Sequence, residues 1–207
     1  MSLPLILATK NKGKTDELKL LLQNLDFNIK SLHDLNTEIE IVEDKDTFEG
    51  NAIKKAEALC EITGSPALSD DSGLCVDALD GRPGVYSARY GKDNFTDKDR
   101  CLYLLEELKD VPDFKRTAHF QCALAFKIPS SECTIFKGTV YGKISMAPVG
   151  SKGFGYDPVF IPDGYDVSMA ELGMDIKNKI SHRAVALNKF YKWVKENYVE
   201  LNKQVKR

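Results

Sequence analysis

The pattern of hydrophobic positions in the first third of the chain predicts two strands and two helices. Residues 3–9 form an apolar run bounded by polar residues, typical of a buried strand. From about Gly13, leucines recur at helical spacing at positions 18, 21, 22 and 25, and residues 27–31 resemble a short strand. A second helix is predicted over residues 47–63, where Gly64-Ser65-Pro66 ends it.

The remaining chain combines a helical pattern with strict alternation. Residues 72–94 are rich in glycine and turn residues and predict an ordered surface loop, and residues 96–108 predict a helix with Leu102, Leu105 and Leu108 on its face. Residues 119–126 alternate as a strand does, and residues 133–141 form its partner across a turn at 129–131. A long loop over 148–162 and a C-terminal amphipathic helix follow. Crossover and hairpin signals together predict an α/β fold with a mixed sheet.

Composition narrows the class of protein. The length of 207 residues predicts one globular domain spanning 1–207. The composition, 43% hydrophobic and 29% charged, excludes disordered and fibrous proteins. The net charge of −2 gives no general attraction for polyanions, so we expect no nucleic-acid partner and only local phosphate binding. Apolar runs fall far short of the roughly 20 residues that cross a bilayer, and no secretory signal is recognisable. We expect a cytoplasmic protein, not bound to membranes, whose five cysteines are reduced.

The turn between the first strand and the first helix carries Lys10, Lys12 and Lys14. Backbone amides at the start of a helix bind phosphate, and three lysines add positive charge. The end of the turn, Gly13-Lys14-Thr15, is similar to a P-loop, but Ala8 stands where that motif requires glycine. The turn is therefore interpreted as a phosphate cradle of another kind, with a P-loop and a solvated lysine-rich helix start as alternatives.

Carboxylates suited to metal binding occur at two places. Ser69-Asp70-Asp71-Ser72-Gly73 follows an apolar run, and alternation along a strand allows only one of the two aspartates to face a shared site. A carboxylate at the end of a strand can bind Mg²⁺ or activate water, although the same residues also favour a turn. Glu43 and Asp44 could supply a further ligand, or could belong to a solvated acidic loop.

Two further motifs could recognise a base. In Gly153-Phe154-Gly155-Tyr156-Asp157-Pro158, glycine allows close backbone approach and leaves a ring free to stack on a flat ligand, unless the segment is a tight turn with an aromatic plug. Lys177 and Ser181-His182-Arg183 could donate to carbonyl oxygens or phosphates. The alternative is a Ser181 helix cap followed by ordinary surface charges.

Together these motifs resemble one family, the inosine/xanthosine triphosphate pyrophosphatases. The resembling pieces occur in the family's order from Thr9 to Arg183: Thr9-x-Asn11-x-x-Lys14, Thr47-Phe48-x-x-Asn51-Ala52-x-x-Lys55-Ala56, Ser69-Asp70-Asp71-Ser72-Gly73-Leu74, Pro83-Gly84-Val85-Tyr86-Ser87-Ala88-Arg89, Gly153-Phe154-Gly155-Tyr156-Asp157-Pro158-x-Phe160 and Ser181-His182-Arg183. One departure is Gly50, where the family often has an acidic residue, and Glu49 is the neighbour that could replace it.

The resemblance implies an elongated mixed β-sheet flanked by helices, with two lobes and an active-site cleft between them. It also implies a homodimer that depends on Mg²⁺ and hydrolyses a purine nucleoside triphosphate such as ITP, dITP or XTP to the monophosphate and pyrophosphate. Metal ligation falls on Glu43 and Asp71, and water activation on Asp71. Substrate contacts fall on Thr9, Lys10, Asn11, Lys12, Gly13, Lys14, Lys55, Ser72, Phe154, Gly155, Tyr156, Asp157, Lys177, His182 and Arg183.

Two other classes of protein remain open from the residues alone. A P-loop-type nucleotide hydrolase or kinase would release or transfer phosphate rather than pyrophosphate. A non-catalytic nucleotide-sensing module would need no carboxylate directed at a metal. Analysis of the products formed from ITP and Mg²⁺ distinguishes all three.

Overall fold

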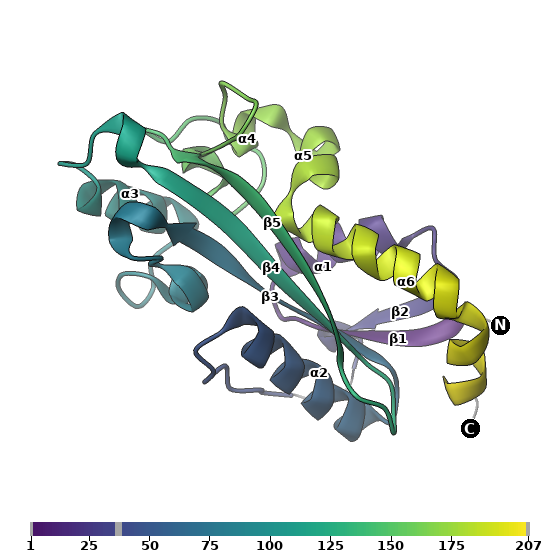
Figure 1. Cartoon of the computed structure of the whole chain (residues 1–207). Helices are drawn as coiled ribbons and strands as arrows, with labels where there is room; N and C mark the ends of the chain where they lie inside the picture. The colour runs from purple at the N-terminus through teal and green to yellow at the C-terminus, as the bar shows by residue number, and fades with distance from the viewer. Residues whose placement is uncertain (1, 36–38, 206–207) are drawn as a thin grey trace. The chain divides into compact units, whose positions relative to one another are not determined.

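A mixed six-stranded sheet forms the centre of the fold in a computed structural model that describes residues 2–35 and 39–205 (Figure 1). The strand order is β2-β1-β3-β4-β5-β6. β1 runs parallel to β2 and β3, whereas β6 is antiparallel to β5. The strands are β1 (Leu3–Ala8), β2 (Phe27–Ser31), β3 (Ala67–Val76), β4 (Thr117–Lys127), β5 (Thr134–Ile144) and β6 (Phe160–Pro162). The predicted α/β class with a mixed sheet is confirmed.

The helices begin where the sequence provides capping side chains. Asn11, Thr47 and Thr96 each accept a hydrogen bond from the backbone N–H three residues further on. The α-helices are α1 (Lys12–Leu22), α2 (Phe48–Thr63), α3 (Asp97–Glu107), α4 (Met169–Leu172), α5 (Met174–Ile180) and α6 (His182–Val205). Short 3₁₀ helices are η1 (Leu32–Asp34), η2 (Asp77–Leu79), η3 (Gly84–Arg89), η4 (Asp113–Lys115) and η5 (Asp157–Val159). Within the described residues, no helix is both long and apolar enough to cross a membrane.

The chain divides into two compact units. Unit 1 comprises Met1–Asp71, Cys122–Gly138 and Val185–Arg207, and unit 2 comprises Ser72–Gln121 and Thr139–Ala184. The boundary falls within elements of secondary structure, because β3, β4, β5 and α6 each contribute residues to both units. Asp71 and Ser72, adjacent in β3, are therefore assigned to different units.

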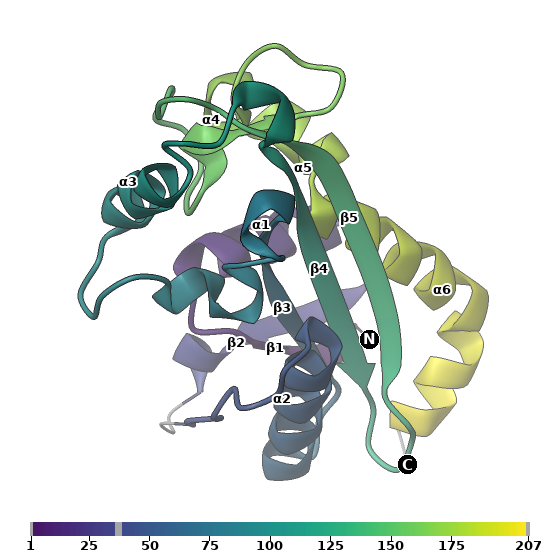
Figure 2. The same cartoon turned by 60° about the vertical axis from the view of Figure 1, so that its left-hand side comes forward.

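In unit 1 the sheet is covered by helices on both faces. One face packs against α1 and α6, through Leu5, Leu7, Leu68, Leu18 and Phe190. The other face packs against α2, through Ile6, Ala67, Leu59 and Cys60. Figure 2 shows α2 on the near side of the strands and α6 on the far side. Because both faces are buried, β1 is a continuous apolar run rather than an alternating one.

In unit 2 a second core surrounds the inner face of α3. It contains Leu74, Val76, Cys101, Leu104, Leu108, Phe120, Tyr156 and Phe160. Arg116 is 2% exposed within this unit. Its guanidinium donates from Nε to the Val111 carbonyl (2.9 Å), from Nη1 to that of Ser145 (3.0 Å) and from Nη2 to that of Leu108 (2.6 Å). This side chain therefore binds the end of α3 and two other backbone segments.

Three predicted elements differ from the structure. Residues 72–76 continue β3 instead of starting a loop, because their apolar side chains complete the second core. The buried face of α3 contains Cys101 and Leu104, whereas Leu102 is 47% exposed. Part of the predicted 148–162 loop forms the short strand β6. The strand at 27–31, the helix over 47–63 and the C-terminal helix are confirmed.

Candidate functional site

The segment from the end of β1 through the first residues of α1, residues 9–14, is called the phosphate loop below. The Thr9 hydroxyl accepts from the Asn11 N–H (3.2 Å), and the Asn11 side chain accepts from the Lys14 N–H (3.0 Å). Lys10, Asn11 and Lys12 are exposed, while Gly13 and Lys14 are half-buried. These local bonds fix the start of α1 and leave charged side chains facing solvent, as a phosphate cradle requires.

Lys14 differs from the other loop lysines because it pairs with a buried carboxylate. Its ammonium forms an ion pair with Asp70, whose side chain is 0% exposed while that of Lys14 is 15% exposed. The Cys122 thiol donates to the second carboxylate oxygen (3.1 Å). A buried carboxylate needs a partner of opposite charge, so Asp70 restricts the position of Lys14.

On the α2 side of unit 1, Lys55 lies between two carboxylates. Its ammonium is 2.5 Å from Glu43 Oε1, 3.2 Å from Asp71 Oδ1 and 2.8 Å from the Asp70 carbonyl oxygen. Burial alone lowers the pKa of Lys55, but the charges of Asp71 and Glu43 outweigh it and raise the pKa above its ordinary value. Lys55 therefore remains an ammonium that draws two carboxylates together.

Asp71 is buried and held by a second partner. The Asn51 amide donates to Asp71 Oδ2 (3.2 Å), and Asn51 is itself fixed because its oxygen accepts from the Lys45 N–H (2.9 Å). Burial raises the pKa of Asp71, and the charges of Lys55 and Lys14 oppose that rise. A raised pKa makes the carboxylate a better proton acceptor near neutral pH.

The two aspartates differ in orientation, as alternation along a strand predicts. Asp70 contacts Lys14 of α1, whereas Asp71 contacts Lys55 and Asn51 of α2. Their position differs from the expectation, because both lie inside β3 rather than in a turn or at its end. The strand tolerates them since each carboxylate has its own cation.

The carboxylates fit a metal ion that takes few protein ligands. Among residues 2–35 and 39–205, no group of three or more His, Cys, Asp or Glu side chains is arranged to hold a metal. Mg²⁺ commonly uses one or two carboxylates and completes its coordination with phosphate and water oxygens. Glu43 and Asp71, which converge on the cation of Lys55, match that donor set.

Gly50 is closely surrounded at the start of α2. A Cβ at this position would lie 2.9 Å from the Cβ of Lys45 and 3.0 Å from the Thr47 hydroxyl. An acidic side chain at position 50 would therefore require its neighbours to move. Its neighbour Glu49 forms an ion pair with Lys137 of β5.

In unit 2, residues 153–157, called the base loop below, are closed by Asp157. One Asp157 oxygen accepts from the Phe154 N–H (2.9 Å) and pairs with the buried Lys177 ammonium (2.5 Å). Gly153 has φ +85°, and a Cβ there would lie 2.1 Å from the same oxygen. Only glycine allows this closure.

Cations surround the half-buried Phe154 ring. The Lys177 ammonium is 4.3 Å and the Arg183 guanidinium carbon 5.8 Å from the ring centroid. Arg183 also donates to the Ser72 hydroxyl (3.0 Å), and His182 stacks on Phe120 with centroids 4.8 Å apart. The predicted residues at 72, 154, 157, 177, 182 and 183 thus lie in one unit as a cationic and aromatic group.

Of the two aromatic rings in this motif, the ring of Tyr156 is not the one free to stack on a ligand. It is 4% exposed, packs in the second core and donates its hydroxyl hydrogen to the Ser87 carbonyl (2.9 Å). Phe154 is therefore the more accessible ring of the base loop.

Comparison with known proteins identifies the family of this chain. The model of the Ham1 family matches residues 5–193. The chain belongs to the Ham1 family. A relative from Geobacter sulfurreducens named "dITP/XTP pyrophosphatase" is 49% identical over 183 residues, which cover 88% of this chain and 92% of that protein. A Bacillus subtilis protein of the same name is 48% identical over 187 residues, or 90% and 94% of the two chains.

Solved Ham1 structures share the fold. The Staphylococcus aureus Ham1 protein superposes with a TM-score of 0.85 at 36% identity, covering 94% of this chain and 99% of that chain. A Ham1 protein from Coxiella burnetii gives 0.84 at 38% identity, with the same coverage of both chains. The family membership and the α/β architecture predicted from the motifs are confirmed.

Sequence analysis of this Ham1 chain assigned no role to Asn51 or Cys122, which donate hydrogen bonds to the carboxylates of Asp71 and Asp70. Asn51 is a buried polar residue on the apolar stripe of α2, next to Ala52. A polar residue in such a stripe, like Lys55 one turn further on, is a signal that could have identified it. Cys122 gave no comparable signal, because a cysteine among alternating apolar residues of a strand is ordinary core.

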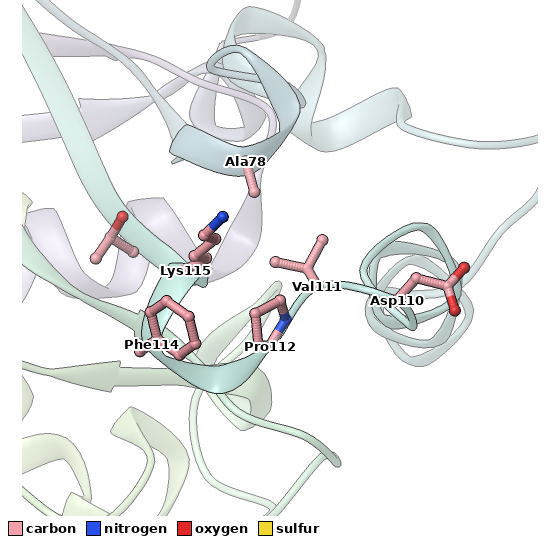
Figure 3. A pocket seen from close by; sticks show the side chains of 7 residues that line it. Ala78, Asp110, Val111, Pro112, Phe114 and Lys115 are labelled. Atoms are coloured by element: carbon pink, nitrogen blue, oxygen red, sulfur yellow. The ribbon is translucent and has the colours of Figure 1, made fainter.

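A separate pocket of about 530 Å³ lies in unit 2 of the Ham1 chain (Figure 3). It is lined by Ala78, Asp110, Val111, Pro112, Phe114, Lys115 and Thr117. This lining is mostly apolar with one lysine, unlike the clustered charges that a triphosphate needs. The charged groups of the phosphate loop and base loop therefore remain the better candidates for nucleotide binding.

Proposed function

We propose that this Ham1 chain hydrolyses deaminated purine nucleoside triphosphates, namely ITP, dITP and XTP, to the monophosphate and pyrophosphate. The observation that carries the proposal is the convergence of Glu43 and Asp71 on the Lys55 ammonium. The relatives named dITP/XTP pyrophosphatase support it, since they match about nine-tenths of the chain.

The triphosphate is bound by positive charge and backbone amides. Lys10 and Lys12 are exposed on the phosphate loop, and the start of α1 adds N–H groups aimed at the same region. Lys14 and Lys55 contribute ammonium groups whose positions are restricted by their carboxylate partners. Phosphoryl transfer depends chiefly on such positioning and charge stabilisation.

Glu43 and Asp71 would hold Mg²⁺, which when bound neutralises phosphate charge. Asp71 accepts the proton of the attacking water, and the raised pKa of its carboxyl favours this role. The water oxygen bonds to the α-phosphorus, and the oxygen bridging the α- and β-phosphates leaves with pyrophosphate. Lys55, beside Asp71, keeps the carboxylate oriented.

The base is recognised by the groups around the Phe154 ring. This ring offers a stacking face, and Arg183, His182 and Lys177 supply donors for an oxygen at C6 of the purine. Adenine has an amino donor at C6, so donor would face donor. Mispaired groups in a buried site can discriminate by roughly 10⁴, which favours ITP over ATP.

In this proposal, the residues that bind the triphosphate and the residues around Phe154 act on the same substrate. Asp71 belongs to the first set and Ser72 to the second, and they are consecutive residues of β3. This direct link in the chain supports a shared substrate. We further propose that residues 1–207 act as one catalytic domain, as a homodimer in the cytoplasm. Family resemblance supports these assignments.

Product analysis tests the proposal. Incubation with ITP and Mg²⁺ in H₂¹⁸O should give IMP and pyrophosphate in one step, with the label in IMP, and EDTA should abolish turnover. Release of IDP and orthophosphate would indicate a P-loop-type hydrolase instead. Binding of ITP without turnover would indicate a nucleotide sensor.

A further inference from the structure

The motifs that resemble the family include residues 83–89, which no step above uses. In the structure Gly84–Arg89 forms η3, and Ser87 lies within it at 8% exposure. The Ser87 hydroxyl donates to the Gly84 carbonyl (2.6 Å) and accepts from the Leu74 N–H (2.9 Å). Ser87 therefore fastens η3 to β3, two residues beyond Ser72.

Ser87 also contacts the base loop. Its carbonyl accepts a hydrogen bond from the Tyr156 hydroxyl (2.9 Å), and both residues are buried. Tyr156 directly precedes Asp157, the residue that pairs with Lys177 and closes the loop. A shift of the Tyr156 side chain would therefore move the segment that carries Phe154 and Asp157.

α3 adds two weaker contacts to the same loop. The Gly155 N–H donates to Asp97 (2.7 Å), and the Cys101 thiol donates to the Gly155 carbonyl (3.4 Å). The Asp97 side chain is 56% exposed, so water competes for that bond. The bond from Tyr156 to Ser87 is shielded from water and is the stronger restraint for that reason.

We propose that Ser87 and Tyr156 are positioning residues: their buried hydrogen bond makes η3 the support that sets the affinity of the base loop for the purine. The inference rests on the proposed function, because the base loop must contact a base. Neither residue touches the reacting phosphate in this account. Loss of the bond should weaken binding of the base while binding of the phosphates is retained.

Tyr156→Phe is the direct test, because it removes one hydroxyl and keeps the ring in the core. Affinity for IMP, measured by calorimetry, should fall about three- to tenfold, the range expected for one net hydrogen bond. The KM for ITP should rise by the same factor with kcat within twofold. Affinity for inorganic tripolyphosphate, which has no base, should stay within twofold of the wild-type value.

Tyr90→Phe provides a matched control. Tyr90 is also a buried tyrosine of the second core, and its hydroxyl donates to Glu107 of α3 rather than to η3. The control should lower the melting temperature as Tyr156→Phe does, yet leave IMP affinity unchanged. Ser87→Ala, which removes the bond to the Leu74 N–H, serves as a second variant if Tyr156→Phe does not fold. It should also weaken IMP binding and spare tripolyphosphate binding.

Three outcomes would overturn the inference. The first is an unchanged IMP affinity in a folded Tyr156→Phe protein, or in Ser87→Ala if that variant must replace it. The second is a loss of tripolyphosphate affinity as large as the loss of IMP affinity. The third is a loss of IMP affinity in Tyr90→Phe as large as that in Tyr156→Phe. Lack of ITP turnover by the wild type would refute the proposed function, and the inference would fall with it. An active wild type beside an unaffected Tyr156→Phe would refute the inference alone.

Discussion

Removing the Lys14 side chain should destabilise the protein far more than the loss of an ordinary surface lysine. Lys14 pairs with Asp70, whose side chain is 0% exposed, so Lys14→Ala leaves a buried carboxylate without this cation. Breaking a buried ion pair from one side typically costs about 3–5 kcal/mol, against at most about 0.5 kcal/mol for a surface substitution. In a protein of this size, that corresponds to a fall in melting temperature of roughly 6–20 °C.

Urea unfolding followed by the fluorescence of the single tryptophan, Trp193, measures the effect. Lys12→Ala, in the same loop but exposed, is the matched control and should change the free energy of unfolding by less than about 0.5 kcal/mol. Adding Asp70→Asn to Lys14→Ala should recover part of the lost stability, because the double variant removes the uncompensated charge. A Lys14→Ala protein as stable as Lys12→Ala, or a double variant no more stable than Lys14→Ala, would refute the reasoning.

Three other predictions concern activity. Asp71→Asn should lower kcat for ITP by about 10²–10⁴-fold through loss of the general base. Asp70→Asn should lower kcat less, because Asp70 faces Lys14. Equal losses in two folded variants would show that Asp71 is not the general base. Arg183→Ala should reduce the ratio of kcat/KM for ITP over ATP, and an unchanged ratio would remove Arg183 from base recognition. Gly153→Ala should raise the KM for ITP roughly tenfold or more, because its Cβ would meet Asp157 at a φ of +85°. Gly155→Ala (φ +62°), whose Cβ meets no atom within 4 Å among the described residues, should raise the KM less, and equal effects would argue against the clash.

Sequence patterns predicted most elements because each one is encoded locally. The strand at 27–31 and the helix after Thr47 follow from short-range periodicity and capping, which need no knowledge of distant residues. Residues 72–76 were predicted as a loop because Ser72 and Gly73 are turn formers. In the structure their backbone continues β3, a tertiary preference that overrides local propensity.

The sequence predicted which residues belong to the candidate site, but not which lysine contacts which aspartate. Motif order identified Lys14, Lys55 and Asp71, yet alternation in a strand shows only that neighbouring aspartates face opposite ways. Which lysine contacts which aspartate depends on α1 and α2 covering opposite faces of the sheet, and that is a property of the packed core. The burial of Tyr156 was missed for the same reason, since its hydroxyl partner Ser87 lies 69 residues away.

The guanidinium of Arg116 has a consequence for how the protein can vary. Its three hydrogen bonds go to main-chain oxygens, at Leu108, Val111 and Ser145, and every residue type supplies such an oxygen. Arg116 is the last residue of the connection from α3 to β4, so one buried side chain fixes the path of a segment whose other side chains are mostly exposed to solvent. Its visible surface, including the 76% exposed Phe114, is free to diverge among relatives or to accept grafted sequences while the backbone stays in place. Arg116 itself has no such freedom, because lysine lacks the planar fork that reaches three carbonyls at once.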